Sequence, residues 1–320
     1  MTVPLAVLGL LVLLLVGATA GPWALGRLGP VLARRPRTGI AAWSGGVVLW
    51  VLGLIALGPL IGWMAAGPAL PGAVGSVCRR CLAASNPFAA PANLTNLPPA
   101  LPLLAAAALA LTIVVALLTT ARRRTREARA HVALLEATGK REVVGGEHVW
   151  LVPAAEPAAY ALPRAGVVLS RGTIDALERS QLGAVLAHEK AHLAGRHHLV
   201  LGALASLRAI FGWVPLLRHA PEAVAAYAEM AADDAALRAH GRRALAGALL
   251  ALHRPGVPTT AHALHAGATH VTSRVARLAG ATRRPARFTA VLTATYLLAV
   301  GAAVTLVAVP YATAVIQGAC

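Results

Sequence analysis

The stretch Leu182-Gly-Ala-Val-Leu-Ala-His-Glu-Lys-Ala-His192 decides how this sequence is interpreted. Its apolar first half predicts a helix, and on a helix residues four apart share a face. The imidazoles of His188 and His192 would then point to one spot, at the spacing that suits a zinc ion. Glu189 follows the first histidine, so its carboxylate is a candidate general base for an attacking water. The alternative is a surface helix that carries two unrelated histidines.

A catalytic zinc ion needs a third protein ligand and one open position. The segment Ala228–Asp234 is also predicted to be helical, and Glu229 within it would complete a ligand set with the two histidines. Asp233 lies four residues later on the same face, where it would hold a ligating histidine through the other ring nitrogen. A solvated acidic helix face is the alternative, but three of the chain's twelve acids fall in this segment. We therefore predict a Zn²⁺ site formed by His188, His192 and Glu229.

The composition indicates a membrane protein with one polar region. Hydrophobic residues make up 58% and charged residues 13%, whereas ordinary soluble domains carry about 25% charge. All twelve acids lie between Glu127 and Asp234, so both ends of the chain are acid-free, although the net charge is +17. The basic residues adjoin apolar runs, and no spacing typical of nucleic-acid-binding motifs is present. We therefore expect the lipid bilayer as a partner and no direct contact with nucleic acid.

Four apolar runs are long enough to cross a bilayer as helices, which takes about 20 residues each. They are Val3–Gly26, Ile40–Trp63, Leu101–Thr120 and Phe288–Tyr311. A signal peptide is the alternative for the first run, but basic residues follow that run rather than precede it. Because arginines gather after the first and third runs, the positive-inside rule predicts a cytoplasmic region 122–287. Both termini and the loop 64–100 would lie outside a plasma (inner) membrane.

Three parts of the chain follow from these runs. Residues 1–121 would form three membrane helices with the external loop 64–100, residues 122–287 a polar domain, and residues 288–320 a fourth span with a short external tail. In the polar domain, the sequence predicts a helix over Thr125–Ala137 and β-strands over Glu147–Val152 and Gly166–Ser170.

The run Leu199–Leu217 is apolar apart from Arg208. One complete crossing would separate His192 from Glu229 across the bilayer, and the run is too short for two crossings. We expect a helix that lies on, or dips into, the inner membrane surface and ends at Pro215. Arg208 would extend to the lipid headgroups.

The other histidines and the cysteines have ordinary interpretations. His197 and His198 follow the motif by one turn, but three ligands already suffice for zinc. His219 and His253 are candidates for hydrogen bonding to an oxyanion, with no basis for a choice between them. Cys78, Cys81 and Cys320 lack the second cysteine pair that a structural zinc site needs, and their redox state stays open.

These motifs resemble those of integral-membrane zinc peptidases typified by the cytoplasmic domain of β-lactam-sensing antirepressor receptors. HtpX-like and CAAX-type membrane peptidases are more distantly similar. The resemblance rests on Ala159–Pro163, Val167–Gly172, Leu186–His192, Glu229–Asp233 and Arg274–Leu278. It implies a mainly α membrane protein with four transmembrane helices. An α+β zincin-like (gluzincin) peptidase domain would be inserted between spans three and four, with Glu189 as the general base.

The resemblance also implies a protein or peptide substrate. An extended substrate would pair with the strand Val167, Val168, Leu169 and Ser170 as a sheet edge, and a transcriptional repressor is one candidate substrate. Two departures are visible: only about nine residues follow the last span, where the receptors carry a sensor domain, and the 199–217 run is too short for the helical hairpin of HtpX-like enzymes.

The expected function is that of a membrane-bound zinc endopeptidase acting on a cytoplasmic or membrane-proximal protein. One alternative is a non-catalytic membrane scaffold or sensor with a structural zinc ion. A small transporter is another, but the predicted spans contain no acid that could carry ions. The oligomeric state is not indicated by the sequence.

Overall fold

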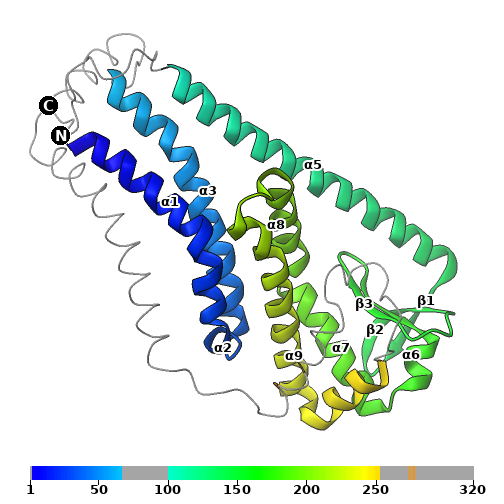
Figure 1. Ribbon diagram of the computed structural model, residues 1–320. Helices are drawn as coiled ribbons and strands as arrows, with labels where there is room; N and C mark the ends of the chain where they lie inside the picture. The colour runs from blue at the N-terminus through cyan, green and yellow to red at the C-terminus, as the bar shows by residue number, and fades with distance from the viewer. Residues whose placement is uncertain (1, 67–99, 253–273, 275–276, 278–320) are drawn as a thin grey trace, which may run out of the picture.

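The computed structural model describes residues 2–66 and 100–252, together with Arg274 and Arg277. Over these residues the protein is mainly helical, with one small mixed sheet at one end (Figure 1). The predicted fourth span, the three cysteines and residues 67–99 of the loop 64–100 lie outside the described residues.

In the described part of the chain, three long helices are apolar enough to cross a membrane. They are α1 (Thr2–Arg27), α3 (Pro36–Ala66) and α5 (Ala100–Thr138), and the short helix α2 (Gly29–Leu32) joins the first two. The first three predicted apolar runs lie within these helices, which supports the membrane character of the chain. Helix α5 does not end at its cluster of arginines but continues for four more turns, so the predicted span and the predicted helix 125–137 are one continuous element.

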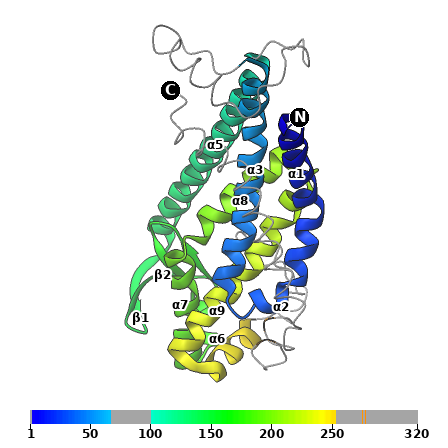
Figure 2. The same cartoon turned by 90° about the vertical axis from the view of Figure 1, so that its left-hand side faces the viewer.

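The membrane-length helices are packed by specific contacts. The indole Nε1–H of Trp50 on α3 donates a hydrogen bond of 2.9 Å to the carbonyl oxygen of Leu14 on α1. Gly58 on α3 lies so close to α5 that a Cβ there would touch Ala106 and the carbonyl oxygen of Pro102, as small residues allow at membrane helix interfaces. Beyond this contact α3 and α5 diverge, and helices α8 (His197–Phe211) and α9 (Pro215–Leu252) fill the space between them (Figures 1 and 2).

The sheet has four strands in the order β1-β2-β4-β3. They are β1 (Lys140–Val144), β2 (Glu147–Val152), β3 (Ala159–Leu162) and β4 (Gly166–Ser170). The predicted strands 147–152 and 166–170 are confirmed, whereas β1 and β3 were not predicted. Gly145 and Gly146 join β1 to β2 with φ values of 60° and 82°, and this two-residue loop suits a hairpin because glycine adopts positive φ readily.

The sheet lies between two helical layers. Alternate residues of a strand face opposite sides, and here Val149 and Leu151 face α7 (Arg179–Ala194), while Trp150 faces α5. On the α5 side, Leu135 of α5 is buried against Trp150, and His131 Nε2 lies 2.7 Å from the hydroxyl of Tyr160 on β3. One helix therefore both forms a membrane-length element and covers a face of the sheet.

The apolar run after the motif corrects two expectations. It is not one helix ending at Pro215: α8 (His197–Phe211) ends earlier, and Pro215 is the first residue of α9 (Pro215–Leu252). Proline suits this position because the first turn of a helix leaves its N–H unpaired in any case. The chain reverses between them, so α8 and α9 form a helical hairpin whose second arm continues far beyond the run 199–217. The Arg208 guanidinium contacts Glu222 of α9 at 3.1 Å instead of extending alone toward headgroups.

The tip of this hairpin lies level with the middle of α3. Phe211 packs edge-on against Trp50, with ring centroids 5.6 Å apart, and Trp50 is near the centre of the apolar window Pro36–Ile61. Trp213 at the tip is 79% exposed. If α3 crosses the bilayer, this indole contacts lipid rather than water.

A Trp213→Lys variant is therefore expected to lose about 2 kcal/mol of unfolding free energy in lipid nanodiscs, because a charged side chain at this depth is costly. Leu250→Lys is the matched control, since Leu250 is 68% exposed but lies at the opposite end of α9. It should change stability by less than about 0.5 kcal/mol. Equal losses in denaturant unfolding of the two variants would contradict insertion of the tip.

Candidate metal centre

Helix α7 carries the two motif histidines on one face. The helix begins after Glu178, whose N–H donates to the Gln181 side chain at 3.1 Å, so the first turn is capped in the manner typical of helix starts. Two turns later, the Nε2 atoms of His188 and His192 lie 3.2 Å apart. Both imidazoles are largely buried, and they point at the same spot.

Helix α9 brings the predicted third ligand to the same spot. The Glu229 carboxylate oxygens lie 3.5 Å from His188 Nε2 and 3.4 Å from His192 Nε2. Helices α7 and α9 pack along much of their length through small side chains such as Ala184 and Ala236, which are fully buried. This close packing allows a carboxylate some forty residues away in sequence to approach the histidine pair.

The spacing of the two imidazole nitrogens and the carboxylate fits a zinc ion. Zinc binds imidazole nitrogen and carboxylate oxygen at about 2.0–2.2 Å in tetrahedral geometry, which separates neighbouring ligand atoms by about 3.3–3.5 Å. Here the two Nε2 atoms are 3.2 Å apart, and each of them lies near a different oxygen of Glu229: Oε2 is 3.5 Å from His188 Nε2 and Oε1 is 3.4 Å from His192 Nε2. Two nitrogens and one oxygen are also a donor set that zinc accepts, and it leaves a fourth position for chemistry. The donor set and its dimensions therefore both suit the predicted metal.

Asp233 lies behind His188, as predicted for a residue that holds the ligand from outside. Its Oδ1 is 3.1 Å from His188 Nδ1, although the angle is too bent for a well-formed hydrogen bond. We regard the contact as chiefly electrostatic, because both groups are buried and Asp233 is only 1% exposed. A carboxylate at this nitrogen favours the tautomer that leaves Nε2 free to bind a metal.

Arg274 is a site residue to which sequence analysis assigned no role. Its guanidinium makes two hydrogen bonds to Asp233, at 2.7 and 2.6 Å, and a third contact of 3.0 Å to Glu229. Such a paired contact fixes a carboxylate in direction as well as in charge. Three residues later, Arg277 contacts Asp234 at 2.7 Å and the carbonyl oxygen of Ala33 at 3.0 Å. The only signal in the sequence was the quoted segment Arg274–Leu278.

The electrostatics of the cluster favour a bound cation. Burial would lower the pKa of His188, but the neighbouring carboxylates of Asp233 and Glu229 raise it to about 10. Burial lowers the pKa of His192 to about 4. Burial alone would raise the pKa of Glu229, but His188 and Arg274 hold it well below its usual value. The buried carboxylates thus remain charged and stabilise positive charge at the point where the imidazoles converge.

Glu189 lies beside the cluster without joining it. Burial raises the pKa of its carboxyl group to about 7, although the positive charge of His188 opposes this shift. The backbone N–H of Ala161 on β3 donates a hydrogen bond to the same carboxylate. A carboxyl group that titrates near neutrality and is held in a fixed direction is suited to proton transfer.

The strand β4 is not a sheet edge, which corrects the predicted substrate contact. Val167, Val168, Leu169 and Ser170 pair with β2 on one side and with β3 on the other. These four residues are buried, so their main-chain groups are not available to a substrate. The edge strand nearest the cluster is β3. The sequence could not indicate this, because β3 is only four residues long and lies between two prolines.

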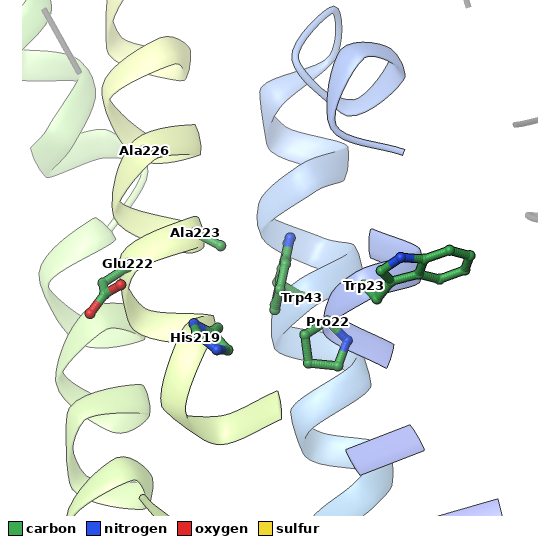
Figure 3. Close-up of a pocket in the computed structure, with 7 residues that line it drawn as sticks. All are labelled: Pro22, Trp23, Trp43, His219, Glu222, Ala223 and Ala226. Atoms are coloured by element: carbon green, nitrogen blue, oxygen red, sulfur yellow. The ribbon is translucent and has the colours of Figure 1, made fainter. Parts of the chain in front are cut away.

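A groove of about 500 Å³ lies apart from the metal cluster, between α1, α3 and α9 (Figure 3). Its lining consists of Pro22, Trp23, Trp43, His219, Glu222, Ala223 and Ala226. His219, one of the two oxyanion candidates, lies in this groove. It is ten residues before Glu229 on α9, which is about 15 Å along the helix axis. The position of His219 therefore does not support its role at the cluster, and the other candidate, His253, lies outside the described residues.

Membrane-length helices joined to a small mixed sheet and to a buried His-His-Glu cluster define the class of membrane-associated metallopeptidases. The model of the BlaR1 peptidase M56 family matches residues 81–278, which is more than half of the chain. The protein therefore belongs to this family, as the resemblance of its motifs predicted.

A second comparison points in the same direction. The Protease HtpX homolog of Aquifex aeolicus (strain VF5) is 32% identical over 85 residues, which cover 25% of this chain and 28% of that relative. The chain thus matches little more than a quarter of the relative's length. No solved structure matches the chain.

Proposed function

We propose that this protein is a membrane-bound zinc endopeptidase that hydrolyses peptide bonds of a cytoplasmic or membrane-proximal protein. The observation that carries the proposal is the convergence of His188, His192 and Glu229: their nearest nitrogen and oxygen atoms lie 3.2–3.5 Å apart, as the ligand atoms around a tetrahedral zinc ion do. A transcriptional repressor is a candidate substrate, as the family resemblance suggests.

His188, His192 and Glu229 would hold the zinc ion. When bound, zinc polarises the scissile carbonyl group and lowers the pKa of an attacking water. Asp233 and Arg274 would keep His188 and Glu229 in position, because their contacts of 2.6–3.1 Å restrain both groups. Such outer contacts commonly contribute 10- to 100-fold to metal affinity.

Glu189 would move the proton. Its carboxylate takes a proton from the attacking water and later gives it to the nitrogen of the leaving amine, so the same group acts first as base and then as acid. The Ala161 N–H holds the carboxylate in direction. The pKa of about 7 that burial confers suits both halves of this exchange near neutral pH.

The edge strand β3 would bind the substrate main chain. The Ser170 N–H donates to the Ala158 carbonyl oxygen at 2.8 Å, and along an antiparallel pair the direction of these bonds alternates from residue to residue. Ala159 and Ala161 therefore turn their main-chain groups away from β4. Because Ala161 also contacts Glu189, a peptide added at this edge would pass beside the general base.

An Ala159→Pro variant tests whether the edge strand β3 binds the substrate main chain. Proline removes an outward N–H, and edge strands tolerate it because the internal ladder is kept. Loss of one main-chain hydrogen bond, about 0.5–1.5 kcal/mol, should lower kcat/KM by about 3- to 10-fold and leave metal affinity unchanged. Val143→Pro on the opposite edge strand β1, where Val143 is 63% exposed, is the matched control and should retain full activity. Equal kcat/KM values for the two variants would show that β3 does not bind the substrate main chain.

We further propose that residues 122–287 carry the peptidase on the cytoplasmic side of a plasma membrane. Both termini and the loop 64–100 would lie outside, and Phe288–Tyr311 would form a fourth span. The distribution of arginines supports this topology. Part of the same range, α8 and the first half of α9, packs with the membrane-length helices, so the peptidase would be embedded at the membrane surface.

The proposed function is tested with the full chain purified in detergent. We expect about one zinc ion per chain and cleavage of a protein substrate that stops with a zinc chelator and returns when zinc is restored. In cells, newly formed protein N-termini should differ between wild type and a Glu189→Gln variant. If the protein binds zinc but wild type and Glu189→Gln give identical sets of protein N-termini, the protein is instead a scaffold with a structural metal ion.

A further inference from the structure

The two ligating histidines have different outer partners. The ring nitrogen of His188 that faces away from the cluster lies against the Asp233 carboxylate, 3.1 Å away. The equivalent nitrogen of His192 instead faces a second imidazole: His192 Nδ1 and His197 Nδ1 lie 3.0 Å apart. The two rings are nearly perpendicular, with centroids 4.9 Å apart and an interplanar angle of 88°. His197 is 7% exposed, so this contact is shielded from bulk water.

The local backbone brings His197 back toward His192. Helix α7 ends at Ala194, and Arg196 adopts a left-handed conformation with φ 48° and ψ 35° before α8 begins at His197. For a side chain other than glycine this conformation is uncommon. Gly195 is needed for a different reason: a Cβ at that position would touch Nε2 of the His197 ring. The tight turn and the absence of a Cβ at Gly195 together allow the His197 imidazole to lie beside the cluster.

A metal bound at Nε2 of His192 would fix the protonation of both rings. Nε2 of His192 faces Glu229 at 3.4 Å and is the nitrogen available to a metal. A metal-binding imidazole carries its proton on the other nitrogen, so His192 Nδ1–H must donate. His197 Nδ1 must then accept, which requires that the proton of a neutral His197 lie on Nε2.

We propose that His197 is a positioning residue that holds His192 in the tautomer and orientation needed to bind the metal. This inference rests on the proposed zinc site. It assigns to His197 the outer role that Asp233 has for His188, with a neutral acceptor in place of a carboxylate.

The accepting atom suggests a discriminating pair of variants. Nδ1 of histidine and Oδ1 of asparagine are each two bonds from Cβ, so His197→Asn retains an acceptor at nearly the same place. His197→Leu keeps an apolar bulk but removes the acceptor. His198→Leu is the matched control, because His198 is the adjacent imidazole on α8 and makes no described side-chain contact with the cluster.

The measurement is zinc affinity of the full chain in detergent, by competition with a chromogenic chelator, with the absorption of the cobalt-substituted protein as a second readout. We expect His197→Leu to bind zinc 10- to 100-fold more weakly and to alter the cobalt spectrum. His197→Asn should stay within about threefold of wild type, and His198→Leu should be unchanged. Thermal unfolding of the metal-free variants checks that all three retain the fold.

The outcomes separate this inference from the function on which it rests. Wild-type protein that binds no zinc overturns both. Wild-type affinity and spectrum in His197→Leu overturn the positioning role alone. Equal weakening in His197→Leu and His197→Asn also overturns it, because that result would reflect loss of the ring's volume rather than of its acceptor.

Discussion

A Glu189→Gln variant is expected to bind zinc as wild type does and to hydrolyse peptide bonds about 10³-fold more slowly. Glutamine has nearly the same shape as glutamate, so it keeps the hydrogen bond from the Ala161 N–H. It cannot accept a proton from water, and positioned general bases contribute about 10²- to 10⁴-fold to such reactions. The two quantities to measure are bound metal per chain and kcat with one protein substrate.

Glu147→Gln is the matched control for this change. Glu147 also contacts helix α7, through a contact of 2.6 Å with Lys190, but both side chains are substantially exposed. An exposed ion pair contributes about 1 kcal/mol at most, so this variant should keep wild-type kcat and wild-type metal content. Undiminished turnover in Glu189→Gln would exclude Glu189 as the base.

A Glu229→Ala variant is expected to lose zinc affinity by more than 100-fold and to lose hydrolysis with it. Removing an outer partner of a ligand commonly costs 10- to 100-fold, and removal of a ligand itself must cost more. His188 and His192 would remain, but two imidazoles on one helix provide only two of the three protein ligands of a catalytic zinc site. Equilibrium dialysis against zinc, followed by metal analysis, measures the affinity.

Glu222→Ala controls for the loss of a carboxylate from α9. Glu222 lies two turns before Glu229 and contacts Arg208 rather than the histidines, so zinc affinity should not change. Stoichiometric, tightly bound zinc in Glu229→Ala would show that the third ligand is elsewhere in the chain.

The candidate site could be predicted largely because its signals are local. The prediction that the two histidines share a face depends only on helical periodicity, which is apparent from five consecutive residues. Glu229 could be proposed as the third ligand because acids are rare in this chain. The structure brings these side chains together, while their binding of metal stays a prediction. Strands β2 and β4 were predictable for a similar reason, since both are rich in β-branched residues bounded by glycine or proline.

The features that could not be predicted depend on long-range packing. Whether β4 is central or an edge depends on pairing with β3, whose four residues carry little strand signal. The hairpin was missed because the run 199–217 was judged for complete crossings of the bilayer, whereas α8 and α9 turn back against α3 at half depth. His197 received no role because three ligands already suffice for zinc, and the left-handed conformation of Arg196, which brings the His197 ring toward His192, could not be predicted from the sequence.

Helix α5 has a consequence for which proteins can be cut. Its 39 residues extend for about 58 Å, with one half suited to lipid and the other packed behind the sheet that carries β3. If α5 crosses the bilayer as proposed, the proposed catalytic residues are held at a constant distance from the lipid. A target must present its cleavable bond at that height, either on a stalk of suitable length or by settling on the lipid surface. Substrates would then be selected by the distance of the cleavable bond from the membrane as much as by amino-acid preference.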